Sequence, residues 1–303
     1  MGSANSSSHV IKRSNLICVK DLAKQLFVDS RIGLDHSAYK LQNSNPSLKI
    51  IDSSMGGQDA LKAFKEEAIP TSRFINVVED LKDPNGRFPN TFPQPDTVKD
   101  VLQSIGVEKD DYIVLYSQEG KTAGATRSFF ILNSYGFNVK LLNGGLFKYI
   151  AEGYPTEKGK IYTGESTKIS GLADPSDSLI TMSEIQEFEK GNSDFQLIDL
   201  RPTEDFNGES EENIEGCREG RVEGAINILT SEILNKDFTF KTEKELGDLI
   251  DKHNLDPKKH TVVMCRTGVA ASVGFAAIHS VSSIPFEKVQ LYDGSWSEYG
   301  SLN

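Results

Sequence analysis

The sequence contains the same pattern twice, and this internal repeat restricts the fold more than any other feature. Three pairs of segments correspond: 49–53 with 196–200, 106–117 with 254–265, and 139–149 with 289–299. The offsets are 147, 148 and 150 residues, which is too consistent for coincidence. Because a near-constant offset indicates a duplicated structural unit, we expect two domains built on one plan. A chain of 303 residues is long enough to bury a modest core in each of them.

Each half of the sequence predicts an α/β fold. Apolar runs of four or five residues, such as 112–116 and 261–264, alternate with helical patterns at 126–135 and 269–281. This alternation is typical of a mainly parallel sheet flanked by helices. The segment between the halves is rich in Gly, Ser, Thr, Pro and Lys and lacks apolar periodicity, so we interpret it as a connector. The expected organisation is an N-terminal domain at 14–155, a linker at 156–178 and a C-terminal domain at 179–303.

The acidic composition limits the kinds of partner. The chain has 44 acidic and 33 basic residues, a formal net charge of -11, and an acidic surface repels both nucleic acid and anionic membranes. A small anionic substrate would therefore need a local positive pocket. No run approaches the roughly 18 apolar residues of a membrane span, and the start lacks the apolar core of a secretory signal. We expect no nucleic-acid partner, no integral membrane segment, and a cytoplasmic or mitochondrial location.

The cysteines and the N-terminus carry weaker signals. Cys18, Cys217 and Cys265 form no C-x-x-C pair and no Cys/His cluster at zinc spacing, which argues against a disulfide framework or structural zinc. Residues 1–6 fit the pattern for N-terminal myristoylation. A flexible Ser-rich tail or a cloning remnant is the alternative interpretation of that segment.

Cys265 lies where an apolar strand meets a helix. The strand would bring it to the carboxyl edge of a parallel sheet, where such sheets bind ligands. The loop 265–270 would then aim backbone N–H groups at the sulfur, and Gly268 permits the tight turn. These amides and the positive helix end predict a lowered thiol pKa and a stronger nucleophile. Arg266 adds a cation for an anionic substrate, and the Thr267 hydroxyl can donate a further hydrogen bond.

Other cysteine chemistries fit the spacing less well. A phosphatase loop needs an arginine six positions after the cysteine, where this chain has Ala271, and a dithiol enzyme needs a second cysteine where it has Gly268. A cysteine hydrolase needs a histidine base. His260 lies at the far end of the strand, and the others have no aspartate or asparagine context to recommend them: His9, His36, His253 and His279. The alternative interpretation is that Cys265 is a buried cysteine with only a packing role, although packing alone does not require an adjacent Arg-Thr-Gly loop.

The loop 265–270 (CRTGVA), the segment 292–299 (YDGSWSEY) and the tandem repeat together resemble the rhodanese family. More narrowly, the chain is similar to the two-domain thiosulfate and 3-mercaptopyruvate sulfurtransferases. The resemblance implies two tandem rhodanese-like domains with the site in the cleft between them. The first domain would lack the nucleophile, since Ser117 occupies the place of Cys265. The second would carry the active-site loop, which ends with Val269 and Ala270.

The resemblance also implies a reaction. The Cys265 thiolate would attack the transferable sulfur of a small anionic donor, thiosulfate or 3-mercaptopyruvate, and become a persulfide. The persulfide would pass its outer sulfur to cyanide or to a thiol such as thioredoxin or glutathione. No metal or organic cofactor is implied. The loop amides suit both the thiolate and the persulfide anion.

The loop and its surroundings depart from the family pattern. Thiosulfate enzymes usually carry Arg then Lys after the cysteine and mercaptopyruvate enzymes Gly then Ser, so Arg266 and Thr267 make a hybrid loop. Asp205 stands where both kinds usually have an arginine that holds the substrate. A second arginine of the mercaptopyruvate enzymes is also missing from its usual position, and Arg218 or Arg221 could supply charge from the same loop.

The first domain departs from the pattern as well. Ala68 stands where the family usually has a histidine, and Asp59 could match an aspartate that would orient it. Without the histidine such a relay is broken. A rhodanese-fold binding or regulatory module with little turnover is therefore the alternative function, motivated by Asp205 and Ala68.

Three smaller features are interpreted as structural. Asp199 and Arg201, after the strand 195–198, match the family's D-x-R and predict an ion pair that supports the active loop. Trp296 and Tyr299 predict packing anchors rather than groups that stack on a substrate.

Overall fold

The computed structural model describes residues 15–32, 35, 38–42, 45–118, 122–211, 214, 216–280 and 289–302. The myristoylation pattern at residues 1–6, His9 and His36 lie outside the described residues. Within the described ranges, no helix is long and apolar enough to cross a membrane.

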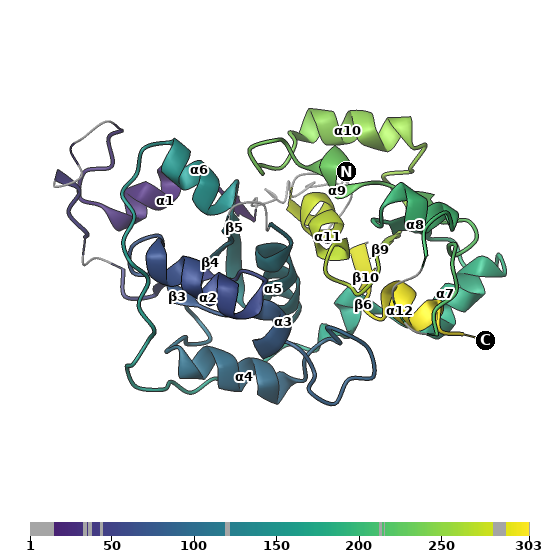
Figure 1. The fold of residues 1–303 in the computed structure, drawn as a ribbon, viewed down its shortest axis with the longest axis horizontal. Helices are drawn as coiled ribbons and strands as arrows, with labels where there is room; N and C mark the ends of the chain where they lie inside the picture. Colours follow the sequence, from purple (N-terminus) through teal and green to yellow (C-terminus); the bar gives the residue numbers. More distant parts are fainter. Residues whose placement is uncertain are drawn as a thin grey trace, which may run out of the picture.

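Five short strands form the sheet of the N-terminal domain (Figure 1). In chain order they are β1 (Leu16–Ile17), β2 (Leu48–Asp52), β3 (Arg73–Phe74), β4 (Tyr112–Tyr116) and β5 (Asn138–Leu142). Their order in space is β1-β5-β4-β2-β3, and every pairing is parallel. Four of the five residues of β4 are buried. The sequence of β4 is apolar throughout because a parallel sheet that is covered on both faces exposes neither side of its strands to water.

The C-terminal domain repeats this sheet. Its strands are β6 (Leu179–Ile180), β7 (Gln196–Asp199), β8 (Ile226–Asn227), β9 (Thr261–Met264) and β10 (Val289–Tyr292). Their order is β6-β10-β9-β7-β8, again all parallel, so each strand takes the place of its counterpart in the first sheet. The predicted α/β fold with two parallel sheets is confirmed.

Helices flank both sheets (Figure 1). The N-terminal domain contains α1 (Val19–Leu26), α2 (Gly57–Glu66), α3 (Val77–Asp80), α4 (Pro95–Ser104), α5 (Thr122–Ser134) and α6 (Gly145–Ala151). The C-terminal domain contains α7 (Met182–Glu189), α8 (Thr203–Asn207), α9 (Thr230–Ile233), α10 (Glu243–Lys252), α11 (Ala271–Ser280) and α12 (Ser295–Tyr299). Local sequence explains some boundaries: α10 begins after a capping box in which Thr242 and Glu245 bond each other's backbone N–H groups.

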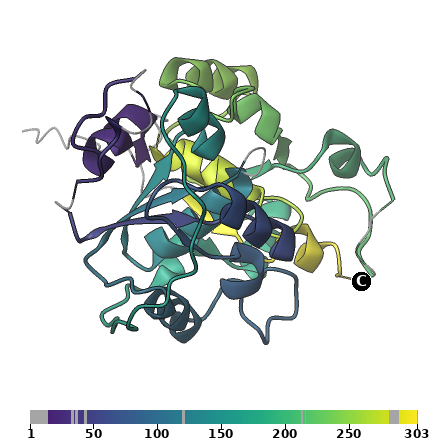
Figure 2. The same ribbon diagram turned by 60° about the vertical axis from the view of Figure 1, so that its left-hand side comes forward.

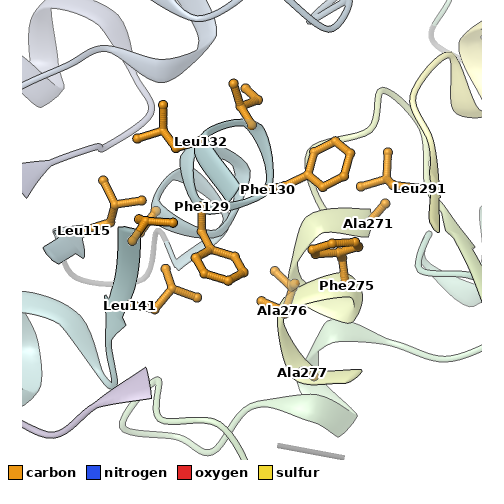
Figure 3. Close-up of a cluster of buried hydrophobic side chains, with 14 of the residues drawn as sticks. Leu115, Phe129, Phe130, Leu132, Leu141, Ala271, Phe275, Ala276, Ala277 and Leu291 are labelled. Atoms are coloured by element: carbon orange, nitrogen blue, oxygen red, sulfur yellow. The ribbon is translucent and has the colours of Figure 1, made fainter. Parts of the chain in front are cut away.

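Helices α5 and α11 join the two domains into one continuous hydrophobic cluster (Figure 3). Phe130 on α5 points toward α11, where its ring meets that of Phe275 edge to face with centroids 4.9 Å apart. The hydroxyls of Thr126 and Ser272 lie 2.9 Å apart in the same interface. Small residues on α11, such as Ala276, allow this close approach. Because Thr126 meets Ser272 and Phe130 meets Phe275, the two helices run in the same direction, and the strand-to-helix loops that precede them lie at the same end of this interface.

The segment 156–178 contacts the N-terminal domain through backbone hydrogen bonds. Glu157 pairs with Ala68 in an antiparallel bridge. Further along, Thr167 and Ile169 donate their backbone N–H groups to Gln103 at the end of α4. A short 3-10 helix, Pro175–Ser178, then leads directly into β6. The connector therefore holds the start of the second sheet close to the first domain.

Candidate active site

Cys265 lies at the carboxyl end of β9 with only 2% of its surface exposed. Its sulfur accepts backbone hydrogen bonds from Ala271, Thr267 and Gly268. The loop 265–270 thus curls around the sulfur before α11 begins at Ala271, two residues later than the helical pattern predicted. The predicted convergence of loop amides on Cys265 is confirmed.

Gly268 is required by the shape of this loop. Its φ is +76°, a left-handed conformation that side chains disfavour. A Cβ atom there would lie 2.8 Å from the carbonyl oxygen of Asp293 and 3.2 Å from Nη1 of Arg127. Both the backbone conformation and the close approach of neighbouring groups therefore require glycine.

The predicted lowering of the Cys265 pKa is wrong. Burial raises the pKa of the thiol above its ordinary value, and the three amide hydrogen bonds from Ala271, Thr267 and Gly268 offset only part of this effect. The negative charge of Asp199 raises it further. The loop therefore provides donors for an anion in a site that water hardly reaches, and the resting sulfur favours the neutral thiol.

The segment 292–299 holds the backbone of the loop. The N–H of Cys265 donates to Oγ of Ser295 at 3.2 Å, and the N–H of Trp296 donates to the carbonyl of Cys265 at 3.0 Å. The N–H of Ser297 donates to the carbonyl of Arg266 at 2.9 Å. Trp296 and Tyr299 are both buried, which confirms their role in packing.

Asp199 and Arg201 form the predicted ion pair, with Nη2 and Oδ2 2.8 Å apart and both side chains buried. Burial raises the pKa of Asp199, although the hydrogen bond and charge of Arg201 oppose this. The Arg201 guanidinium also lies 4.3 Å from the centre of the Trp296 ring and donates to the carbonyl of Gly220. The pair thus connects the end of β7 to the residue that bonds the Cys265 carbonyl.

Arg266 is paired with Asp205, a contact that sequence reasoning did not predict. Its Nη2 lies 2.5 Å from Oδ2 of Asp205, which belongs to α8. The Ser210 hydroxyl donates to the other carboxylate oxygen. Burial works against ionisation of Asp205, but the hydrogen bonds from Ser210 and Arg266 outweigh it and lower the pKa. The carboxylate that replaces the expected arginine therefore offsets the charge of the loop arginine.

Arg218 and Arg221 are exposed and lie on aromatic rings. The Arg218 guanidinium is 4.9 Å from the centre of the Trp296 ring. The Arg201 guanidinium lies over the same ring. The Arg221 guanidinium is 5.0 Å from the ring of Phe206. Among the described residues, no hydrogen bond or ion pair joins either guanidinium to the loop 265–270. Figure 2 shows α8 at the outer edge of the C-terminal domain.

Two residues of the first domain reach the loop. The side-chain amide of Asn90 donates to Oγ1 of Thr267 at 3.1 Å, which leaves the hydroxyl hydrogen of the threonine for the donation that the sequence predicts. Arg127 on α5 donates to the carbonyl of Gly268 at 3.3 Å and forms an ion pair of 2.7 Å with Asp293. Sequence reasoning missed both. The available signal was a charged residue, Arg127, in the middle of an otherwise uncharged helix.

The remaining predicted residues lie around the loop or away from it. Val269 is buried, and its carbonyl accepts hydrogen bonds from both N–H and Oγ of Ser272. Ala270 lines an interdomain cavity of about 380 Å³. Asp59 is exposed in the first turn of α2, while Ala68 is buried at its bridge with Glu157.

The histidines in the described part of the chain have partners that suit packing. His279 is buried, stacks on Phe275 and lies 2.8 Å from the side-chain amide of Asn15. His260 packs against Phe195, and His253 lies 3.5 Å from Glu232. These positions give no support to a Cys–His hydrolase.

Ser117 shows how the first domain differs at the corresponding position. It is buried, and its hydroxyl accepts a hydrogen bond from the N–H of Ala125 at 2.8 Å, as Cys265 does from Ala271. Eight positions separate Ser117 from Ala125, whereas six separate Cys265 from Ala271. The first domain thus keeps the strand-to-helix succession but has an alcohol in place of the thiol, and the amide that bonds it lies inside α5, which begins at Thr122.

Comparison with known proteins gives the family. The family model described as the rhodanese-like domain matches residues 35–152 and 184–302. The 3-mercaptopyruvate sulfurtransferase of Escherichia coli K12 is 28% identical over 276 residues, covering 89% of this chain and 94% of the relative. A putative thiosulfate sulfurtransferase of Mycobacterium bovis is 30% identical over 246 residues, covering 79% of this chain and 85% of the relative.

Solved structures share the fold. The crystal structure of SseA from Escherichia coli, a 3-mercaptopyruvate sulfurtransferase, superposes with a TM-score of 0.76 at 24% identity, over 93% of this chain and 99% of that one. The Tum1 protein from Saccharomyces cerevisiae superposes with a TM-score of 0.77 at 21% identity, over 94% of each chain. With two matching domain ranges, two sheets of one topology and a cysteine-centred loop in the second, the chain belongs to the rhodanese family.

Proposed function

We propose that this protein is a sulfurtransferase in which Cys265 is the nucleophile and the sulfur carrier. The arrangement that carries the proposal is the loop 265–270, whose amides from Ala271, Thr267 and Gly268 converge on one sulfur atom at the end of a strand. The similarity to relatives named as 3-mercaptopyruvate and thiosulfate sulfurtransferases supports the same activity.

The first step forms a persulfide. The Cys265 thiolate attacks the transferable sulfur of the donor, a new S–S bond forms, and the bond between that sulfur and the rest of the donor breaks. The electron pair leaves with sulfite from thiosulfate, or with the enolate of pyruvate, which then takes up a proton, from 3-mercaptopyruvate. The loop amides already point at the sulfur, so they stabilise the anion without reorganising.

The second step passes the sulfur on. A thiolate such as that of glutathione or thioredoxin, or cyanide, attacks the outer sulfur of the persulfide. The S–S bond breaks and its electron pair returns to Cys265 as a thiolate. Neither step requires a metal or an organic cofactor, because sulfur is the electrophile in both, and sulfite or the enolate in the first step and the Cys265 thiolate in the second carry away the electron pair.

Mass spectrometry of the intact protein tests the proposal. Incubation with thiosulfate or 3-mercaptopyruvate should add the mass of one sulfur atom, and a thiol acceptor should remove it. Cys265→Ser should abolish the added mass. Cys217→Ser is the matched control and should keep it, because Cys217 contacts Ser301 and the backbone of Ser297 rather than the loop amides. Addition that persists in Cys265→Ser would refute the assignment.

A binding or regulatory module is the second candidate, and the Asp205–Arg266 pair favours it, since this pair removes the charge expected to hold an anionic donor. Steady-state rates separate the two functions. An enzyme should turn over at least one donor far faster than a free thiol with the same thiolate fraction reacts. Turnover no better than that of a free thiol with every donor would favour the module.

A further inference from the structure

The interdomain cavity of about 380 Å³ has walls from both domains. Helix α9 packs beside α11 there (Figure 1). The walls include Thr122 and Ala123 at the start of α5, Ala270 and Val273 around the start of α11, and part of the segment from Thr230 to Phe238. Ligand sites commonly lie between domains and measure about 300–1,000 Å³, so this cavity has the size of a site for a small molecule.

The internal repeat identifies the counterpart of this cavity on the other side of the interface. Ala125 and Ala271 occupy equivalent positions, because each donates its backbone N–H to the first residue after the central strand of its sheet. Two positions further along, α5 carries Arg127 and α11 carries Val273. Arg127 is buried in contact with the loop around Cys265, whereas Val273 lines the cavity.

The shorter side chain explains why the cavity exists. Nη2 of Arg127 donates to the carbonyl of Asn90 at 2.6 Å, so the guanidinium occupies the space between α5 and that residue. Phe238 corresponds to Asn90, and the two share a left-handed backbone, with φ of +61° and +59°. Val273 is too short to reach Phe238 as Arg127 reaches Asn90, and both Val273 and Phe238 line the cavity. Space that a guanidinium occupies on one side is therefore open on the other.

The charges differ between the two sides as well. Arg127 is paired with Asp293, which also accepts the backbone N–H of Phe92 at 2.6 Å. The equivalent residue, Asn143, accepts the backbone N–H of Phe240 at 2.8 Å but is uncharged. The side with the cavity thus lacks both the buried cation and the buried anion of its counterpart.

Lys236 supplies the charge of the cavity, as the one charged residue among its described lining residues. Within the described ranges, no hydrogen bond or ion pair involves its ammonium group. The acidic residues nearest to it in the sequence have cations of their own, Lys148 for Asp237 and Lys252 for Glu232. A cation without a counter-charge in an otherwise uncharged cavity favours an anionic ligand.

The remaining lining suits a ligand that is only partly polar. The hydroxyl groups of Thr122, Thr230 and Ser231 can bond an anion, and they bond to no other described side chain or backbone group. Leu234 and Phe238 add apolar surface. A ligand that matches this lining has one anionic group and an apolar body.

We propose that the cavity is a second binding site, which takes a small carboxylate with an apolar body and places the carboxylate at Lys236. Cys265 is not among the described lining residues. The inference therefore goes beyond sulfur transfer and does not depend on it.

The test uses benzoate as the probe and benzamide as its uncharged twin of similar size. Isothermal titration calorimetry at low ionic strength measures both affinities. We expect Kd of benzoate to be about three- to fivefold lower than that of benzamide, the scale of an ion pair with an exposed lysine. In Lys236→Gln this difference should disappear. Equal Kd values in the unaltered protein, or no binding of benzoate, would overturn the inference.

A second variant tests the location of the site without changing a charge. Ala123→Leu keeps a good helix former in α5 and extends an apolar side chain into the cavity, so it should weaken both probes. Lys244→Gln removes an exposed cation from α10, outside the cavity, and is the matched control that should leave both Kd values unchanged. Benzoate binding that survives Ala123→Leu unchanged would place the probe elsewhere and refute the site. Cys265→Ser should bind benzoate normally, so failure of the proposed sulfur transfer is a separate result.

Discussion

The guanidinium of Arg127, carried by the N-terminal domain, donates a hydrogen bond across 3.3 Å to the carbonyl oxygen of Gly268 in the loop of the C-terminal domain. The same side chain forms an ion pair with Asp293, and its Nη2 donates to the carbonyl of Asn90 at 2.6 Å. One buried arginine thus connects α5, a loop of its own domain and the candidate active loop. The first domain, which has Ser117 in place of the cysteine, remains part of the site as its support.

Replacing Arg127 should therefore damage both stability and activity. Arg127→Ala leaves the Asp293 carboxylate without its cation at a poorly exposed position, and we expect a loss of about 3–5 kcal/mol in the free energy of unfolding. Urea unfolding and the rate of sulfur loading measure the two effects. Arg87→Ala removes an exposed cation from the same domain. It should change the free energy of unfolding by no more than about 0.5 kcal/mol and leave the loading rate unchanged. An Arg127→Ala variant with unchanged stability and rate would contradict this account.

Gly268→Ala should disrupt the loop. The added methyl group would require a positive φ and would lie 2.8 Å from the carbonyl oxygen of Asp293, so the backbone must shift away from the sulfur. We expect destabilisation of at least about 1 kcal/mol and a larger proportional loss in the loading rate. The comparison is Gly247→Ala in α10, where no neighbouring atom lies within 4 Å of the added carbon. That change should stabilise the protein slightly, because alanine favours the helix.

The loading rate should depend on pH through Cys265. Because burial raises the pKa of this thiol, only a small fraction is thiolate near neutral pH. The rate with thiosulfate, whose charge is constant above pH 6, should rise about tenfold per pH unit until the thiol ionises. Alkylation of Cys265 by iodoacetamide, followed by mass spectrometry, should rise in parallel. A rate that is already constant from pH 7 upward would show that the loop lowers the pKa after all.

Asp52 should make the stability depend on pH. It occupies the place of Asp199, but Ser54 stands where Arg201 would be, so the buried carboxylate has no arginine and burial raises its pKa from 3.8 to about 6. Between these two values the folded state holds a proton that the unfolded state has released. This contribution to stability is complete below pH 3.8 and is lost as the pH rises through the interval to about 6.

Asp52→Asn removes that titration. The difference in unfolding free energy between the variant and the unaltered protein should shift in favour of the variant from pH 4 to pH 6.5, by an amount on the order of 2 kcal/mol. Urea unfolding at several pH values measures it. Asp96→Asn, an exposed carboxylate in the first turn of α4, is the control and should show no comparable shift. A pH-independent difference for Asp52→Asn would contradict the raised pKa.

The sequence predicted the fold well because the fold depends on local patterns. Runs such as 112–116 and 261–264 are apolar throughout, which is the pattern that strands buried on both faces require. The near-constant offset of the repeat then implied two copies of one sheet, and the two strand orders agree. Helix starts were less predictable: the apolar pattern continues through Val269 and Ala270, but those residues belong to the loop around Cys265.

The sequence also predicted the position of Cys265 and the convergence of amides on its sulfur, since both follow from a strand, a loop with glycine and a helix in immediate succession. The ion pair of Asp199 and Arg201 was predictable for the same reason, because two positions separate them. Each of these relationships is contained within a few residues of chain.

Only the tertiary structure decided the electrostatics. The pKa of Cys265 depends on burial, which outweighs the local amides. Asp205 meets Arg266 across 61 positions, and Arg127 meets Gly268 across 141, so no local pattern could indicate either contact. The sequence by itself determined the duplicated α/β fold and the residue at the centre of the loop. The charge that surrounds that residue was decided by packing, because Coulomb interactions depend on distance in space and on exclusion of water, whatever the separation along the chain.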